Sequence, residues 1–164
     1  MGDMIEFKCN NVLFKYRIVG IALHNDRVLL QKSKLDTHWA LPGGRAEMFE
    51  DSIATLKREM LEELKVEVSV GRLIWIVENF YEYTGQLVHE VALYYLIHFP
   101  PESALYQLDT PLITQDNGYE LTFQWHPIGT IEQLYLLPEF LQRSLKSIPM
   151  GTEHVVVSDF QEKN

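Results

Sequence analysis

The sequence predicts an α+β fold in which helices pack on a mixed β-sheet. Two observations lead to this prediction: strand-like apolar runs outnumber helical segments, and they lack the regular βαβ order of a parallel sheet. A third is size and composition, because 164 residues that are 46% hydrophobic can bury one core. We therefore expect one domain over residues 1–148 and a tail over residues 149–164.

The first elements are predicted from apolar runs and turn residues. Ile18–Leu23 and Val28–Leu30 are β-rich runs on either side of Asn25 and Asp26, which favour a turn, so residues 17–33 should form a hairpin. Residues 35–45 contain proline and glycine and are expected to form a loop.

A helix is expected from Asp51 or Ser52 to about Leu64, because Glu50 and Asp51 suit the positive end of a helix dipole. The later elements are predicted in the same way. They are strands at 73–83 and 89–99 joined at Gly85-Gln86, a loop or excursion at 100–118, a strand at 121–126, a two-piece helical segment at 130–145 broken before Pro138, and an edge strand at Val155–Val157.

Charge and cysteine content limit the possible partners and compartments. The formal net charge is −9, which repels a phosphate backbone, so we expect no nucleic-acid partner. Cys9 is the single cysteine and cannot form an internal disulfide, which fits a reducing cytoplasm. The chain opens without a signal-peptide pattern and its apolar runs are too short to span a bilayer. The expectation is therefore a cytoplasmic protein that has no membrane partner.

The predicted helix gathers carboxylates on one side. At 100° per residue, Glu59, Glu62 and Glu63 fall within one arc of about 100°. The apolar stripe beside this arc is expected to contain Ile53, Leu56, Met60 and Leu64. A helix docked by that stripe would hold its carboxylates at the rim of a cleft.

A divalent cation would relieve the repulsion among these carboxylates, since like charges at helical spacing cost about 0.2–0.5 kcal/mol per pair. Mg²⁺ takes oxygen ligands from a few carboxylates and from substrate phosphates, and it lowers the pKa of a bound water. The pattern thus favours a metal–phosphate site. The alternative is a solvated glutamate-rich face on which Arg58 only pairs with Glu62.

The surrounding residues resemble the Nudix hydrolase box. That box runs Gly, five residues, Glu, seven residues, Arg-Glu, an aliphatic, any residue, Glu-Glu, any residue, Gly, an aliphatic. This chain supplies Gly44, Glu50, Arg58, Glu59, Met60, Glu62, Glu63 and Val66 at those spacings. Lys65 replaces the final glycine, which leaves two alternatives: backbone strain in a left-handed residue, or a different helix end. The resemblance covers about residues 12–146 and implies an α/β/α sandwich with a loop–helix–loop catalytic box.

The resemblance also implies roles for residues. Glu59 and Glu63 would be the main Mg²⁺ ligands, with Mn²⁺ as a possible substitute and with help from Glu62 and a carbonyl of Gly43. Arg58 would orient the catalytic Glu59, the first choice as general base, although family members differ in which acid serves. Further candidates are a metal-binding Glu90 and substrate-binding Arg17, Gly44, Arg45, Phe80 and Tyr83.

The function implied is magnesium-dependent hydrolysis of a pyrophosphate bond in a nucleoside diphosphate linked to another group. Nucleoside triphosphates, dinucleoside polyphosphates and nucleotide sugars all remain open as substrates. One alternative is a domain that senses a nucleotide ligand without turnover, and another is a structural interaction domain. The protein is expected to be a monomer or a homodimer.

Overall fold

A computed structural model describes residues 2–160, so Met1 and residues 161–164 of the predicted tail lie outside the described residues. Its strands are β1 (Glu6–Cys9), β2 (Val12–His24), β3 (Arg27–Ser33), β4 (Gly43–Arg45), β5 (Ser69–Tyr83), β6 (Gln86–His98), β7 (Leu112–Asp116), β8 (Tyr119–Pro127) and β9 (Glu153–Ser158). Its helices are α1 (Ser52–Leu64), α2 (Leu141–Ser144) and the 3₁₀ helices η1 (Ala104–Gln107) and η2 (Ile128–Gln133).

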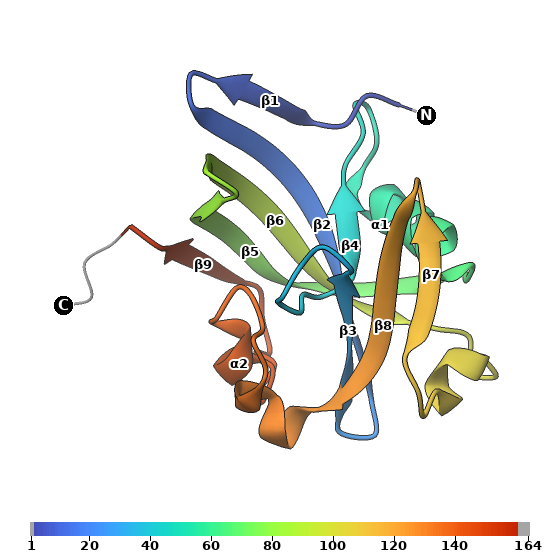
Figure 1. Cartoon of the computed structure of the whole chain (residues 1–164). Helices are drawn as coiled ribbons and strands as arrows, with labels where there is room; N and C mark the ends of the chain where they lie inside the picture. Colours follow the sequence, from blue (N-terminus) through green and yellow to red (C-terminus); the bar gives the residue numbers. More distant parts are fainter. Residues whose placement is uncertain (1, 161–164) are drawn as a thin grey trace.

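The strands form one mixed sheet in the order β7-β8-β3-β2-β6-β5-β9, with β1 and β4 each paired to β2 (Figure 1). The pairs β2–β6 and β5–β9 are parallel, and the other pairs are antiparallel. The mixed sheet that the sequence predicts is therefore confirmed.

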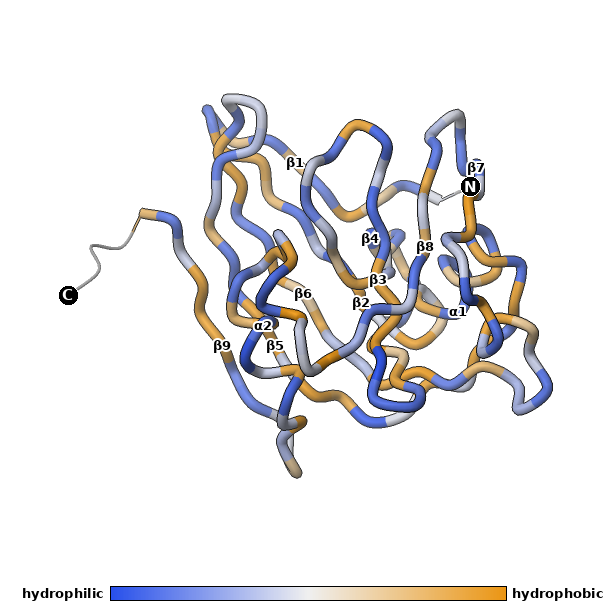
Figure 2. The backbone as a smooth tube through the Cα atoms, turned by 60° about the horizontal axis from the view of Figure 1, so that its bottom comes forward, coloured by the Kyte–Doolittle hydropathy of each residue, from blue (hydrophilic) through white to orange (hydrophobic). Residues whose placement is uncertain are grey.

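Helical segments cover both faces of the sheet. Alternate residues of β2 point to opposite sides, so Ile18 packs in a core with Leu56 and Met60 of α1, and Val19 packs in a second core. That second core contains residues of η2 and α2. Hydrophobic stretches lie mainly along the strands and the connecting turns are mostly hydrophilic (Figure 2). This arrangement confirms the α/β/α sandwich.

Helix α1 has the predicted bounds and a side-chain cap. The Oδ1 atom of Asp51 accepts a hydrogen bond from the Ala54 N–H at 2.9 Å, which satisfies a free donor of the first turn. Leu56, Met60 and Leu64 are buried as expected, but Ile53 is exposed. Including Ile53 in the buried stripe was wrong, because its side chain is 43% exposed while Ser52 of the same turn contacts Tyr95 of β6.

At the other end of α1, Lys65 is left-handed, with φ 56° and ψ 34°. Its backbone N–H donates to the Leu61 carbonyl at 3.1 Å, and its ammonium donates to the Glu62 carbonyl at 2.6 Å. Of the two alternatives for the missing glycine, the structure has the left-handed lysine, with the side chain capping a free carbonyl.

Several predicted loops and helices are different in the structure. The expected loop at 35–45 ends in strand β4, and the excursion at 100–118 contains η1 and β7. The two-piece helical segment at 130–145 is the 3₁₀ helix η2, which begins at Ile128, and a single turn of α-helix, α2. The apolar patch Val155–Val157 forms the expected edge strand. Within residues 2–160, none of the helices is long and apolar enough to cross a membrane.

Candidate active site

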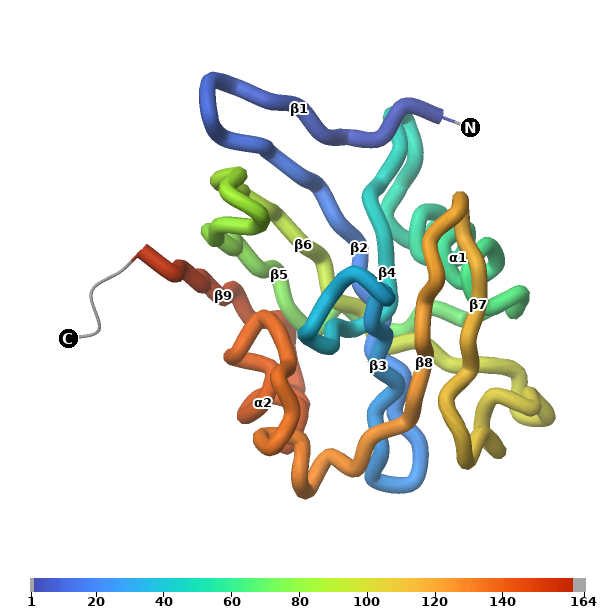
Figure 3. The backbone as a smooth tube through the Cα atoms, in the orientation of Figure 1, coloured from blue at the N-terminus to red at the C-terminus, as the bar shows by residue number. Residues whose placement is uncertain are grey.

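The candidate site lies where strand β2 changes its neighbour. Residues Leu23 and His24 of β2 pair with β3, whereas Arg17, Ile18 and Val19 pair with β4. The sheet opens between β4 and β3, and a cavity of about 420 Å³ lies there. It is lined by residues of β2, β4, α1, the β5–β6 pair and the β7–β8 hairpin, so its walls come from segments far apart in the sequence (Figure 3).

The two loop glycines allow the helix to approach β4. A Cβ atom on Gly44 would lie 2.0 Å from the Glu59 Cδ, and one on Gly43 would lie 2.2 Å from the Ile18 carbonyl oxygen. Both distances are far below van der Waals contact. The glycines are therefore required by the close packing of the Glu59 carboxylate and of β2.

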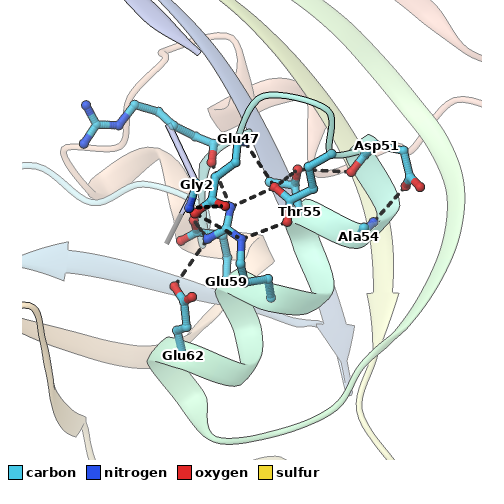
Figure 4. Close-up of polar contacts among 10 residues, drawn as sticks. Gly2, Glu47, Asp51, Ala54, Thr55, Glu59 and Glu62 are labelled. Atoms are coloured by element: carbon cyan, nitrogen blue, oxygen red, sulfur yellow. Dashed lines mark hydrogen bonds and ion pairs between the residues drawn. The ribbon is translucent and has the colours of Figure 1, made fainter. Parts of the chain in front are cut away.

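Arg58 holds the loop and the helix together. Its Nε and Nη2 donate to the two carboxylate oxygens of Glu50 at 2.8 and 3.0 Å. Its Nη1 donates to Glu59 at 2.7 Å and to Glu62 at 3.3 Å, contacts that belong to the polar network in Figure 4. Its Nη2 also donates to the Arg45 carbonyl at 3.1 Å. A planar guanidinium that makes all these bonds fixes Glu59 relative to the loop.

Glu50 forms a clamp with Arg58 that joins the loop to the helix. It is not one of the described residues that line the cavity. Besides Arg58, it accepts hydrogen bonds from the Thr55 hydroxyl at 2.8 Å and the Glu47 N–H at 3.1 Å. The hydrogen bonds from Arg58 lower the pKa of Glu50 to about 2, against burial that opposes the shift. Glu50 therefore steadies the loop that precedes α1.

Glu59 and Glu63 lie one helical turn apart on the cavity side of α1, and each is only 6% exposed. Burial raises the pKa of Glu59, although Arg58 opposes the change. Burial, with the nearby charge of Glu59, raises the pKa of Glu63 to about 8. The Glu63 Oε2 atom is buried and has no hydrogen-bond partner within residues 2–160.

An orphaned carboxylate oxygen beside a second buried carboxylate suits a divalent cation, which accepts such oxygen ligands. The described part of the chain nevertheless contains no group of three His, Cys, Asp or Glu side chains arranged to hold a metal ion. Arg58 Nη1 binds both Glu59 and Glu62, and the Glu62 side chain is 44% exposed. Glu59 and Glu63 are thus the residues that fit a cation best, and Glu62 lies at the rim.

A row of cations faces these carboxylates. Lys15 and Arg17 share one face of β2, and Arg17 is in direct register with Arg45 of β4. Like charges directly opposite each other destabilise a sheet, so this placement favours an anionic ligand between them. Arg45 also pairs with Glu6, whereas the Arg17 Nε has no hydrogen-bond partner in the described chain.

Glu90 lies across the cavity on β6, opposite Lys15 in the parallel β2–β6 register. It is 6% exposed and accepts a hydrogen bond from the Tyr81 hydroxyl at 3.2 Å. Glu90 is therefore buried inside β6 and is not an exposed acid at a strand end.

The structure brings most of the predicted site residues to this one cavity. Those that line it are Arg17, Gly43, Gly44, Arg45, Glu59, Glu62, Glu63 and Glu90. Phe80 and Tyr83 are not among the described residues that line it. Phe80 stacks on His89 at 4.5 Å, on the face of the sheet opposite to Glu90, and the Tyr83 hydroxyl donates to Asp36 at 2.7 Å.

Other cavity residues were not predicted from the sequence, among them Lys15, Asp116, Asn117 and Tyr119. The last three belong to the β7–β8 hairpin, whose strand β7 packs against α1 (Figure 3). Asn117 and Gly118 form its turn with φ of 47° and 82°. An Asn-Gly pair between apolar alternations is a strong hairpin signal, so this element was predictable from the sequence.

Comparison with known proteins was made on this geometry. A family model described as NUDIX domain matches residues 15–148, and no curated protein matches the chain. Among solved structures, the MutT protein from Methanosarcina mazei Go1 is similar at 16% identity, covering 81% of this chain and 91% of that chain, with a TM-score of 0.59. The MutT NUDIX hydrolase from Burkholderia pseudomallei is similar at 23% identity, covering 71% and 84%, with a TM-score of 0.55.

An ADP-ribose pyrophosphatase from Streptococcus suis 89-1591 is similar at 17% identity, covering 87% of this chain and 98% of that chain, with a TM-score of 0.52. At these identities the solved structures establish the fold alone. The family model covers most of the chain, and the charged residues of the box line or support one cavity. The chain therefore belongs to the Nudix family.

Proposed function

We propose that this protein hydrolyses, with Mg²⁺, the pyrophosphate bond of a nucleoside diphosphate linked to another group. The observation that carries the proposal is the cavity itself, in which the buried carboxylates of Glu59 and Glu63 face the cations Arg17 and Arg45. A pyrophosphate has the charge to bridge the two sides, provided that a cation accompanies it on the acidic side. The names of two similar structures, an ADP-ribose pyrophosphatase and a UDP-X diphosphatase, are compatible with such a substrate.

The cation would be held by Glu59 and Glu63, with Glu62, Glu90 and the Gly43 carbonyl as further oxygen donors. When bound, Mg²⁺ supplies charge neutralisation on the phosphate oxygens and a water of lowered pKa. It would also give the orphaned Glu63 Oε2 a partner.

The chain's own residues then have separate tasks. Arg17 and Arg45 bind phosphate oxygens, and the small Gly44 lets the substrate and Glu59 lie close together. Arg58 holds one oxygen of Glu59 at 2.7 Å, which leaves the other oxygen to accept a proton from the attacking water. The water oxygen bonds to phosphorus, the anhydride P–O bond breaks, and the leaving phosphate departs with the bonding electron pair.

The test is product formation from a panel of nucleoside triphosphates, nucleotide sugars and dinucleoside polyphosphates. With Mg²⁺ we expect turnover of at least one class, loss of turnover with a chelator, and a fall in kcat of about 10²–10⁴-fold in Glu59→Gln. Glu67→Gln is the matched control, because Glu67 is an exposed acid just beyond α1 that lies outside the cavity lining. Its kcat should equal that of the wild type.

Two results would count against this function. Turnover that survives in Glu59→Gln would show that the carboxylate is not the base. Nucleotide binding without turnover across the whole panel would favour a ligand-sensing domain.

A further inference from the structure

The catalytic cavity offers a nucleobase little to bind. Apart from Tyr81, Tyr119 and Met4, its wall is polar or charged, or formed by glycine. Tyr81 is held in the wall by the hydrogen bond from its hydroxyl to Glu90 at 3.2 Å. The phosphates of a nucleotide fit the charges here, but the base requires an aromatic or apolar surface elsewhere.

A second hollow of about 330 Å³ adjoins the cavity. It lies between the residues that follow β3, Lys34 and Leu35, and the β7–β8 hairpin, from which Gln115, Gly118 and Tyr119 contribute. Tyr119 lines both spaces, so this residue lies at the boundary that they share.

The ring of Tyr119 is available and well supported. It is 59% exposed, and its hydroxyl makes no hydrogen bond to another residue of the described chain. Its backbone is fixed, because Tyr119 pairs with Asp116 across the two-residue turn. Next to it, Glu120 accepts a hydrogen bond from the Lys34 N–H at 3.0 Å and pairs with the Lys34 ammonium at 3.5 Å. The hairpin is thereby joined to the end of β3.

The hollow also carries groups that can bind a nucleoside. No atom of the described residues lies within 4 Å of the position that a Cβ atom on Gly118 would take. A planar group can therefore reach the Gly118 backbone. Gln115 and Lys34 supply polar side chains, and Leu35, which is largely exposed, supplies an apolar one. On the cavity side, Asn117 places an amide near the same ring.

We propose that Tyr119 is the stacking platform for the substrate's nucleobase, with the nucleoside in the second hollow and the phosphates in the catalytic cavity. The inference rests on the proposed function and adds to it the position of the base. Stacking of a base on an aromatic side chain changes affinity by about 5- to 100-fold upon alanine substitution.

The experiment measures binding by calorimetry with Mg²⁺ present. The probes are the α,β-methylene analogues of the four common nucleoside triphosphates, which have a base but resist cleavage at that bond, and inorganic tripolyphosphate, which has no base. Tyr119→Ala should weaken the tightest-binding analogue by about 5- to 100-fold relative to tripolyphosphate. Tyr119→Phe keeps the ring and should restore the affinity. Tyr135→Ala is the matched control, because Tyr135 is 56% exposed and lies outside both spaces.

The outcomes separate this inference from the proposed function. If Tyr119→Ala weakens the binding of the analogue and of tripolyphosphate equally, Tyr119 only shapes the phosphate cavity. If it weakens the binding of neither, the base lies elsewhere. Either result would overturn the inference. Turnover by a Tyr119→Ala variant with unchanged KM would overturn it too while leaving the function intact. Tyr119-dependent binding without turnover of any nucleotide would support the base site and refute the hydrolase.

Discussion

The clamp between Glu50 and Arg58 gives a prediction about stability and its pH dependence. Glu50 accepts two hydrogen bonds from Arg58, at 2.8 and 3.0 Å, and one from the Thr55 hydroxyl at 2.8 Å. These bonds favour the charged carboxylate and lower its pKa from 4.5 to about 2. Glu50→Gln keeps the shape of the side chain and removes the charge.

The shift sets the size of the effect. A pKa lowered this far corresponds to at most about 3 kcal/mol of folding free energy at neutral pH. The Glu50 side chain is 16% exposed, so screening reduces this to about 2 kcal/mol. For a chain of this length, Tm should fall by about 4–8 °C in Glu50→Gln.

The sign of the pH dependence follows from the lowered pKa. The carboxylate stabilises the fold fully above the unfolded pKa of 4.5, and this contribution is lost as the pH falls towards 2. The difference in Tm between wild type and Glu50→Gln should therefore be constant from pH 8 to 6 and shrink below pH 4.5.

Thermal unfolding followed by circular dichroism between pH 3 and 8 measures this difference. Glu47→Gln is the control, because Glu47 belongs to the same loop but lies 3.8 Å from the Arg58 Nε without a hydrogen bond to it. Its loss should cost less than half as much. A difference for Glu50→Gln that stays the same from pH 7 to 3, or that matches Glu47→Gln, would refute the proposed clamp.

Three further predictions concern the same helix and its loop. Gly44→Ala places a methyl group 2.0 Å from the Glu59 Cδ and should lower kcat by about 10²-fold. Gly129→Ala, with open space among the described residues, should leave steady-state kinetics unchanged. Lys65→Gly removes the strain of a left-handed residue and should raise the free energy of unfolding in urea by about 1 kcal/mol. Lys57→Gly within the same helix should lower it by a similar amount. A change of the same sign in both variants would contradict this prediction. Glu63 has its pKa raised to about 8, so in chelator its charge costs stability as the pH rises from 4.5 through 8. Glu63→Gln should therefore raise Tm at pH 9 but not at pH 4, and a rise that is equal at both would refute the assignment.

The helix and its acids were predictable because they depend on local rules. A 3.6-residue period places Glu59 and Glu63 on one side, and Asp51 caps a free N–H three residues on. The exposed Ile53 shows the limit of that reasoning, since a helical wheel gives the direction of a side chain but not the neighbours that cover it.

The strand residues of the site were harder to predict, because a register error of one residue moves every side chain of a strand to the opposite face of the sheet. Phe80 and Tyr81 are both aromatic and both half-buried, so the sequence alone does not tell which one faces the cavity. Lys15 and Glu90 meet only through the parallel pairing of β2 with β6, strands that lie 62 or more residues apart in the chain. Strand β4 has three residues, too few to show a period.

The distribution of charge explains how an acidic chain can bind an anion. The acids of the box divide into two groups, because Glu50 is fully satisfied by Arg58 and Thr55, whereas Glu63 keeps an oxygen without a partner in the described chain. Glu50 therefore stabilises the fold, whereas Glu63 has a buried oxygen that can accept a further ligand. On the opposite wall, Arg17 and Arg45 are in register across β2 and β4, and Arg45 also pairs with Glu6. Because Lys15, Arg17 and Arg45 line the cavity, the net charge of −9 does not by itself exclude an anionic ligand.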